Sequence, residues 1–172
     1  MPSDTSNMDT GGNGLGDGVV EDGQHAPLYF SLQYIKDLSF ENPRAPDVYE
    51  KFEEPNVGIN VNVGARNIRD RIFEVTLRLS VEAKNTTGTS FLIELEYAGI
   101  ANVSPELPEE NIQPLVLIEG PRMLYPFART IVANLTRDAA FPLLLLGHMD
   151  FVSMYRQGMQ QQAEQQGEQP QG

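Results

Sequence analysis

Residues 117 to 155 read LIEGPRMLYPFARTIVANLTRDAAFPLLLLGHMDFVSMY, and this stretch predicts two helices joined by a long apolar connection. In its first part Met123, Phe127, Ile131 and Leu135 recur every fourth residue, which is the spacing of one face of an α-helix. Leu124 and its neighbours widen this apolar stripe beyond what a surface helix with one buried edge needs. One pair of helices cannot cover the stripe on both sides, so we expect Leu124, Phe127, Ile131 and Leu135 to form an interface between copies of the chain.

Three features affect where this helix and the next one begin and end. Pro126 lies inside the pattern, and a proline beyond the first helical turn costs about 3 kcal/mol or more, so the helix is expected to kink at Pro126 or to start close to it. The connection FPLLLLG at residues 141 to 147 is unusually apolar for a loop, and it fits either a buried strand or a covered loop. Asp150 is the expected N-cap of the second helix, because a carboxylate there accepts backbone N–H bonds.

The preceding half of the chain alternates between apolar and polar residues with the period of a β-strand. Strands are expected at residues 28–41, 59–63, 73–83 and 91–97, the last two joined by a turn in which Gly88 supplies a positive φ. In the first strand the apolar set is expected to face inward, and it consists of Leu28, Phe30, Leu32, Tyr34, Leu38 and Phe40. Asp37 and Glu41 are expected to face outward.

The order of the elements predicts the fold class. A short helix is expected from Glu109 to Ile118, so all strands precede all helices. Four strands with one polar face predict an α+β fold, with a four-stranded antiparallel sheet and helices packed on one face.

Composition predicts one domain with two flexible ends. Residues 1–25 are rich in Gly, Asp, Asn and Ser and are expected to be disordered, residues 26–157 form the domain, and residues 158–172 form a flexible Gln-rich tail. No segment has the pattern of a signal peptide or the roughly 20 apolar residues of a membrane span, so the cytoplasm is the expected location.

Charge and cysteine content exclude several functions. The net charge is −12, from 24 acidic and 12 basic residues. This argues against binding to nucleic acids or anionic membranes and favours basic partners or plain solubility. The chain has no cysteine, which excludes disulfides and thiolate metal sites.

The sequence offers little for catalysis. Its only histidines are His25 and His148, and no phosphate-binding loop, nucleophile elbow or zinc-binding helix motif occurs. Glu109 and Glu110 are better explained as first-turn residues of a helix than as paired catalytic acids. We therefore expect no enzyme, cofactor or metal, although a small catalytic domain using His148 with Asp150 stays an alternative.

Three motifs carry a resemblance to a known family. GPRMLYPFAR at 120–129 and TRDAAFPLLLLGHMDFVSMY at 136–155 resemble the C-terminal signature of SecB, the bacterial protein-export chaperone, and YIKDLSFENPRAP at 34–46 resembles its N-terminal strand motif. The match covers roughly residues 28 to 157. The chain departs from the family pattern at Gly120, where cysteine is usual, at Ala139–Ala140, where glycine is common, and at His148–Asp150, where a Pro-Ile-Asn type sequence is usual.

The resemblance implies an ATP-independent chaperone that holds presecretory proteins unfolded and delivers them to the SecA ATPase. It also implies a homotetramer built as a dimer of dimers. A SecB-like chaperone dedicated to a single client, such as an antitoxin, is the alternative.

Two binding surfaces are expected. Leu92 faces outward between carboxylates, a pattern that suits docking of a basic, partly apolar peptide, although an ordinary hydrophilic sheet face would look similar. In SecB-like proteins the residues that match Asp37, Glu41, Leu92 and Glu94 contact SecA. A client-binding groove is expected from aromatic and methionine side chains near the apolar connection, namely Tyr34, Phe40, Phe141, Met149, Phe151 and Tyr155. For Phe40 and Phe151 a place in the core is an equal alternative.

Overall fold

The computed structural model describes residues 26–167, so the expected disorder of residues 1–25 lies outside the described part. Four strands come first: β1 (Leu28–Glu41), β2 (Asn56–Arg69), β3 (Ile72–Asn85) and β4 (Gly88–Val103). A short 3₁₀ helix, η2 (Asp47–Tyr49), lies between β1 and β2, and the helices α1 (Glu109–Asp138) and α2 (Phe151–Gly167) follow the strands. None of the helices in the described region is long and apolar enough to span a membrane.

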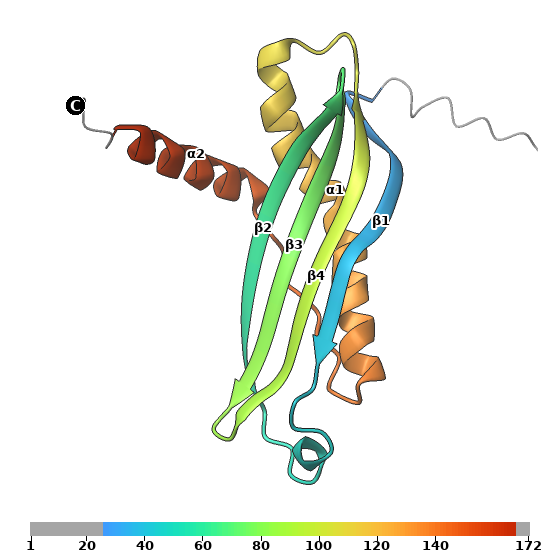
Figure 1. Ribbon diagram of the computed structural model, residues 1–172, viewed down its shortest axis with the longest axis vertical. Helices are drawn as coiled ribbons and strands as arrows, with labels where there is room; N and C mark the ends of the chain where they lie inside the picture. The colour runs from blue at the N-terminus through green and yellow to red at the C-terminus, as the bar shows by residue number, and fades with distance from the viewer. Residues whose placement is uncertain (1–25, 168–172) are drawn as a thin grey trace, which may run out of the picture.

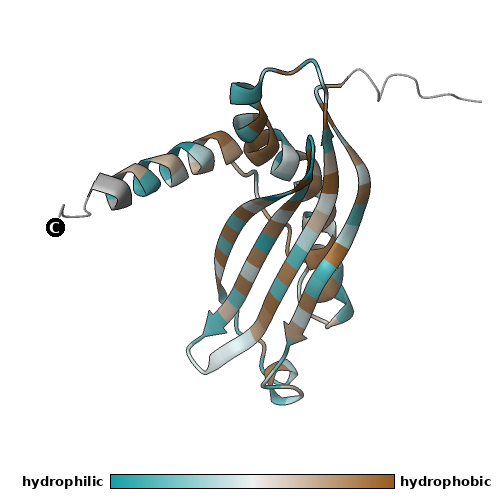
Figure 2. Ribbon diagram, turned by 45° about the horizontal axis from the view of Figure 1, so that its top comes forward, coloured by the Kyte–Doolittle hydropathy of each residue, from teal (hydrophilic) through white to brown (hydrophobic). Residues whose placement is uncertain are grey.

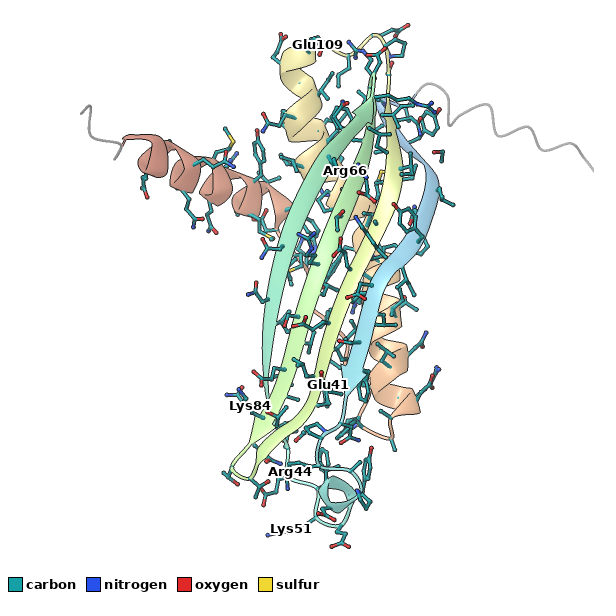
Figure 3. The ribbon with its side chains drawn as sticks, in the orientation of Figure 1. Glu41, Arg44, Lys51, Arg66, Lys84 and Glu109 are labelled. Atoms are coloured by element: carbon teal, nitrogen blue, oxygen red, sulfur yellow. The ribbon has the colours of Figure 1, made fainter. Side chains whose placement is uncertain are left out.

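The strands form one antiparallel sheet in the order β1-β4-β3-β2. Along each strand apolar and polar residues alternate (Figure 2), so the sheet has one apolar face, and α1 covers that face (Figure 1). The most deeply buried side chains of the core include Val75, Leu77, Leu79 and Ile93. The predicted α+β fold with an antiparallel four-stranded sheet is confirmed.

The helix α1 differs from the prediction of two separate helices. It is a single helix of 30 residues that contains Pro114, Pro121 and Pro126. The local cost of these prolines is offset because the helix buries a continuous face against the sheet over its whole length, including Val116 and Val132. Tertiary burial therefore overrides the local helix-breaking signal.

The strand β1 contains two β-bulges that the alternation rule could not predict. The pairing with β4 shifts between Phe30 and Leu32, and again between Ile35 and Asp37. A one-residue shift exchanges the two faces of a strand, so the stretch between the bulges is turned over and the second bulge restores the original sides. The prediction that Leu32 and Tyr34 face inward is therefore wrong.

Glycines allow the helix and the sheet to approach closely. A Cβ atom on Gly99 would lie 2.5 Å from a ring carbon of Phe30 and 3.1 Å from a methyl carbon of Leu124. A Cβ atom on Gly120 would lie 3.1 Å from a methyl carbon of Val75, so any side chain at this position requires Val75 to move.

The helix α2 contacts the rest of the molecule mainly through its first turn. Phe151 is buried and Tyr155 is half-buried, whereas the side chains from Arg156 onward are exposed in the described part. In Figure 1 the helix projects beyond the β2 edge of the sheet. Residues 158–167, which the sequence predicted to be frayed helix leading into a flexible tail, are helical in the structure.

Candidate functional site

The face of the sheet opposite α1 brings the predicted acidic patch together. In the register of β1, β4 and β3, Leu92 lies between Glu41 and Glu82, and the next row on this face has Glu94 between Ser39 and Ser80. Asp37 lies in the row after that, opposite Glu96. Residues directly opposite one another share a face, so Asp37, Glu41, Leu92 and Glu94 form one surface, which we call the acidic face.

The carboxylates on this side of the sheet fall into two groups. Glu74 and Glu96 form ion pairs with nearby cations, and Glu82 forms one with Lys84. Asp37, Glu41 and Glu94 take part in no ion pair within residues 26–167. The unpaired carboxylates are thus the three for which the sequence resemblance implied contact with a basic partner, whereas Glu96, which has the same strand parity, is paired.

Beside the acidic face lies a compact polar cluster centred on Glu74, which the sequence did not reveal. Glu74 is only 5% exposed and accepts hydrogen bonds from the Tyr34 hydroxyl at 2.5 Å, from Lys36 Nζ at 3.1 Å and from Arg66 Nη2 at 3.0 Å. The hydrogen bond from Tyr34, followed by those from the two cations, lowers the pKa of Glu74 to about 2. The same bond, with burial, raises the pKa of Tyr34 to about 12.

Tyr34 is therefore misplaced in the predicted client groove. The first bulge turns it onto the face opposite α1, where its hydroxyl donates to Glu74. One sequence signal could have exposed the error: Lys36 interrupts the apolar alternation of this strand, and it lies at the second bulge.

A hollow of about 290 Å³ lies between β2, the N-terminal third of α1 and one side of α2. Phe151 and Tyr155, two predicted groove residues, line it. Its other lining residues are aliphatic, methionine, glycine or amide residues without a charge: Val61, Asn62, Val63, Gln113, Leu117, Met154, Gln157, Gly158, Met159, Gln161 and Gln162. Such a lining suits extended polypeptide, because it offers apolar contacts and amide hydrogen bonds without requiring a particular charge.

The remaining predicted groove residues lie elsewhere. Phe40 stacks on Phe91 with ring centroids 6.1 Å apart, and Phe91 in turn contacts Phe141 at 4.8 Å. Phe141 is buried in the core, and Phe151, although it lines the hollow, is only 2% exposed. Met149 is half-buried and packs against the core.

The apolar connection between the helices, residues 139–150, is an irregular segment fixed by α1 and not a strand. The Leu144 N–H donates to Thr136 Oγ1 at 3.1 Å, and the Tyr125 hydroxyl donates to the carbonyl of Gly147 at 2.5 Å. Leu146 points into the core, whereas Leu143 and Leu145 are 53% and 60% exposed. These two exposed leucines extend the apolar surface and were not distinguished from their buried neighbours by the sequence.

The two ends of this connection are explained by local geometry. Ala140 has φ 59°, a left-handed conformation that favours glycine, which is the residue common at this place in the pattern. Asp150 accepts a hydrogen bond from the Ser153 N–H at 3.0 Å, which confirms the predicted N-cap of α2.

Comparison with known proteins identifies the family. The family model described as preprotein translocase subunit SecB matches residues 21–162. The chain belongs to the SecB family. Protein-export protein SecB of Bradyrhizobium sp. strain BTAi1 is 46% identical over 161 residues, which cover 93% of this chain and 97% of the relative. That of Rhodopseudomonas palustris strain BisB5 is 44% identical over 152 residues, covering 87% and 96%.

A solved structure supports the fold of this SecB-family chain. A SecB-like chaperone of Mycobacterium tuberculosis, solved in complex with an antitoxin peptide, aligns with a TM-score of 0.55 and 20% identity. The alignment covers 74% of this chain and 94% of the other. By its membership of the SecB family, and not by this likeness of fold, the chain is a protein-export chaperone and not an enzyme, as the sequence led us to expect.

Asp150, the acidic residue of the catalytic alternative, serves as the N-cap of α2. The carboxylate oxygens of Asp150 interact with the backbone and hydroxyl groups of Ser153, at 3.0 and 2.7 Å. His148 is exposed, and the described region holds no group of three or more side chains that could bind a metal ion.

The predicted interface stripe on α1 divides into a buried and an exposed part. Leu124 is completely buried against the sheet of its own subunit, so it cannot contact a second copy and its assignment to an interface is wrong. Phe127 is 52% exposed, and Ile131 and Leu135 are half-buried. Leu124 is enclosed by the sheet, whereas Phe127, three residues later, lies at the margin of the contact beside Tyr97, and the apolar spacing alone does not separate these two positions.

The Glu74 cluster predicts two pH windows of stability loss. Glu74 titrates at about 2 in the folded chain and near 4.5 when unfolded, so its contribution is present above pH 4.5 and is lost as the pH falls from about 4.5 to about 2. Tyr34 titrates at about 12 when folded and near 10 when unfolded, so its contribution is lost as the pH rises from 10 to 12. Urea unfolding midpoints across both windows measure these losses. Glu74→Gln should flatten the acid window and Tyr34→Phe the alkaline one, and unchanged profiles in both variants would contradict the assignment.

Proposed function

We propose that this chaperone uses two separate surfaces, one for unfolded presecretory proteins and one for SecA. The observation that carries the proposal is the separation of chemistry across the sheet. Unpaired carboxylates and Leu92 lie on the face opposite α1, and the uncharged hollow and exposed leucines lie on the other side. Client holding and delivery can then occur on one particle without competition for the same atoms.

The client surface is proposed to consist of the hollow and the connection that leads from it. Tyr155 lines the hollow, Met149 lies just before α2, and Leu143 and Leu145 extend the apolar area. Tyr34, Phe141 and Phe151 are left out of this revised set for the reasons given above. Aliphatic, aromatic and methionine side chains accept many apolar sequences because their contacts depend little on direction.

The SecA surface is proposed to be the acidic face. SecB-like proteins contact a basic segment of SecA through residues that match Asp37, Glu41, Leu92 and Glu94. Asp37, Glu41 and Glu94 form no ion pair within the described residues. This supports the proposal, because their charge remains available to a partner.

Self-association into a dimer of dimers in the cytoplasm completes the proposal. The exposed part of the α1 stripe supports one contact. The edge strand β1 supports another, since Leu32, Ile35 and Leu38 along it are exposed and its outer backbone edge is unpaired within the described chain. Several client surfaces on one particle would hold a long chain by avidity.

Export is favoured over service to a single antitoxin. The relatives that are 44% and 46% identical are protein-export proteins, whereas the chaperone solved with an antitoxin peptide is only 20% identical.

An aggregation assay tests the client surface. The protein should suppress aggregation of a slowly folding client near equimolar ratio and without nucleotide. The double change Leu145→Gln with Tyr155→Gln should weaken this severalfold, because it removes apolar contact area at roughly 25 cal/mol per Å². Both side chains are outside the fully buried core, so the melting temperature and native mass should stay near the wild-type values.

Leu145→Met with Tyr155→Phe is the matched control, since it keeps apolar side chains of similar size and should preserve holding. Failure of the wild type to suppress aggregation at severalfold excess would refute the client surface.

A further inference from the structure

Glu96 lies beside the acidic face but is less exposed than the carboxylates of that face. It is in β4, two residues beyond Glu94, with Asp37 of β1 opposite it on one side and Arg78 of β3 on the other. Its side chain is only 19% exposed. A partner that docks on the sheet would therefore meet Glu94 and Asp37 before it met Glu96.

The carboxylate of Glu96 is occupied by two cations of its own subunit. Arg78 donates from Nε at 3.0 Å to one oxygen and from Nη2 at 3.3 Å to the other. Lys36 Nζ lies 3.5 Å from Glu96 and 3.1 Å from Glu74. The hydrogen bonds from Arg78 keep the pKa of Glu96 below its ordinary value, so this carboxylate is charged at neutral pH.

The two cations are close enough to the acidic face to oppose a basic partner. Lys36 directly precedes Asp37, and Arg78 is one row from Ser80, which pairs with Glu94. Successive rows on one face of a sheet are about 7 Å apart. This is within the screening length of about 8 Å at physiological ionic strength, so the charge of Arg78 reaches the row of Glu94.

We propose that Glu96 is a positioning residue of the SecA-binding surface: it holds Arg78 and Lys36 against the sheet, so that their positive charge does not neutralise Asp37 and Glu94. The inference rests on the proposed SecA function of the acidic face. Glu96 acts through the two cations and does not contact the partner.

The net charge of this cluster explains why the loss of Glu96 should weaken binding of a basic partner. Lys36, Arg66 and Arg78 interact with Glu74 and Glu96, so the cluster carries one net positive charge. Removal of the Glu96 charge raises this to two and frees Arg78, whose side chain is 60% exposed, to turn toward Glu94.

The test is a titration of purified SecA with the full-length protein at low and high salt. Glu96→Gln should weaken binding about threefold to tenfold at low salt, and the difference should shrink at high salt as charges are screened. Glu96→Gln with Arg78→Gln should restore binding to within about twofold of wild type, because the freed cation is gone. Glu110→Gln is the matched control: it removes the same charge at an exposed position on α1 and should leave binding unchanged.

The double variant separates positioning from contact. If it binds as weakly as Glu96→Gln alone, Glu96 acts by its own charge or contact and the proposal is overturned. Lys36→Gln with Arg78→Gln provides a second measurement in which Glu96 is retained, and binding at low salt should become tighter than wild type. Weaker binding in this variant would also overturn the proposal. Because the variant retains Glu96, it still tests the proposal if Glu96→Gln does not fold.

Glu94→Lys distinguishes this inference from the function on which it rests. If Glu94→Lys abolishes SecA binding and Glu96→Gln does not alter it, only the positioning role fails. If neither variant alters binding, the acidic face is not the SecA surface.

Discussion

Phe127→Asp is expected to convert the proposed tetramer into smaller species with the fold of each chain intact. Phe127 is 52% exposed in a single chain and contacts its own sheet through the Tyr97 ring, with ring centroids 6.4 Å apart, so the change removes one contact at the edge of the core and leaves the fully buried core intact. Between subunits it would bury a carboxylate without a partner, which costs several kcal/mol. Native mass spectrometry measures the outcome, against a wild-type mass of four chains of 19.1 kDa each.

Two further variants make this result specific. Phe127→Leu keeps an apolar side chain and should preserve the tetramer. Leu124→Asp should instead unfold the chain, because Leu124 is fully enclosed by its own sheet. A wild-type mass near 19.1 kDa, or a Phe127→Asp protein that stays tetrameric, would rule out this face of α1 as an interface.

Charge reversal of the acidic face is expected to abolish SecA binding and to leave client holding intact. In Asp37→Lys with Glu94→Lys, attraction to a basic segment becomes repulsion. Both side chains are exposed and form no ion pair within residues 26–167, so each change should alter stability by no more than about 0.5 kcal/mol. A SecA titration and an aggregation assay on the same preparations measure the two activities.

The controls for charge reversal test its mechanism. Glu106→Lys with Glu110→Lys makes the same change in net charge at exposed positions near the start of α1 and should leave SecA binding near the wild-type level. Leu92→Ala should weaken binding with little change in its salt dependence, because it removes apolar contact and no charge. Loss of both activities after charge reversal would mean that the two surfaces are one, and unchanged SecA binding would mean that the acidic face only confers solubility.

The β1 strand shows why some site residues were predictable and others were not. Asp37 and Glu41 follow the second bulge, where the strand has returned to its original parity, so counting alternate residues placed them correctly. Tyr34 lies between the bulges and was placed on the wrong face. A bulge depends on how two strands pair, and a rule applied to one strand contains no information about its partner.

The helix α1 also has some features that its sequence predicted and others that it did not. Its apolar spacing identified a helix and a broad stripe from residues 123 to 135. It did not reveal that three prolines would be accommodated in one helix, or that Leu124 would be buried while Phe127 stayed exposed. The burial of Leu124 depends on how closely the helix approaches the sheet at Gly99, where a Cβ atom would lie 3.1 Å from the Leu124 side chain.

By itself, then, the sequence determined the class of fold, the order of strands and helices, the N-cap at Asp150 and the family. These follow from local periodicity, from hydrogen bonds between near neighbours and from motifs that lie along the chain. Only the tertiary structure decided which carboxylates are paired, because Glu74 meets Tyr34 and Lys36 across 40 and 38 positions of sequence. The charge that a partner would encounter depends on that pairing, since an ion pair forms where distant strands place opposite charges side by side.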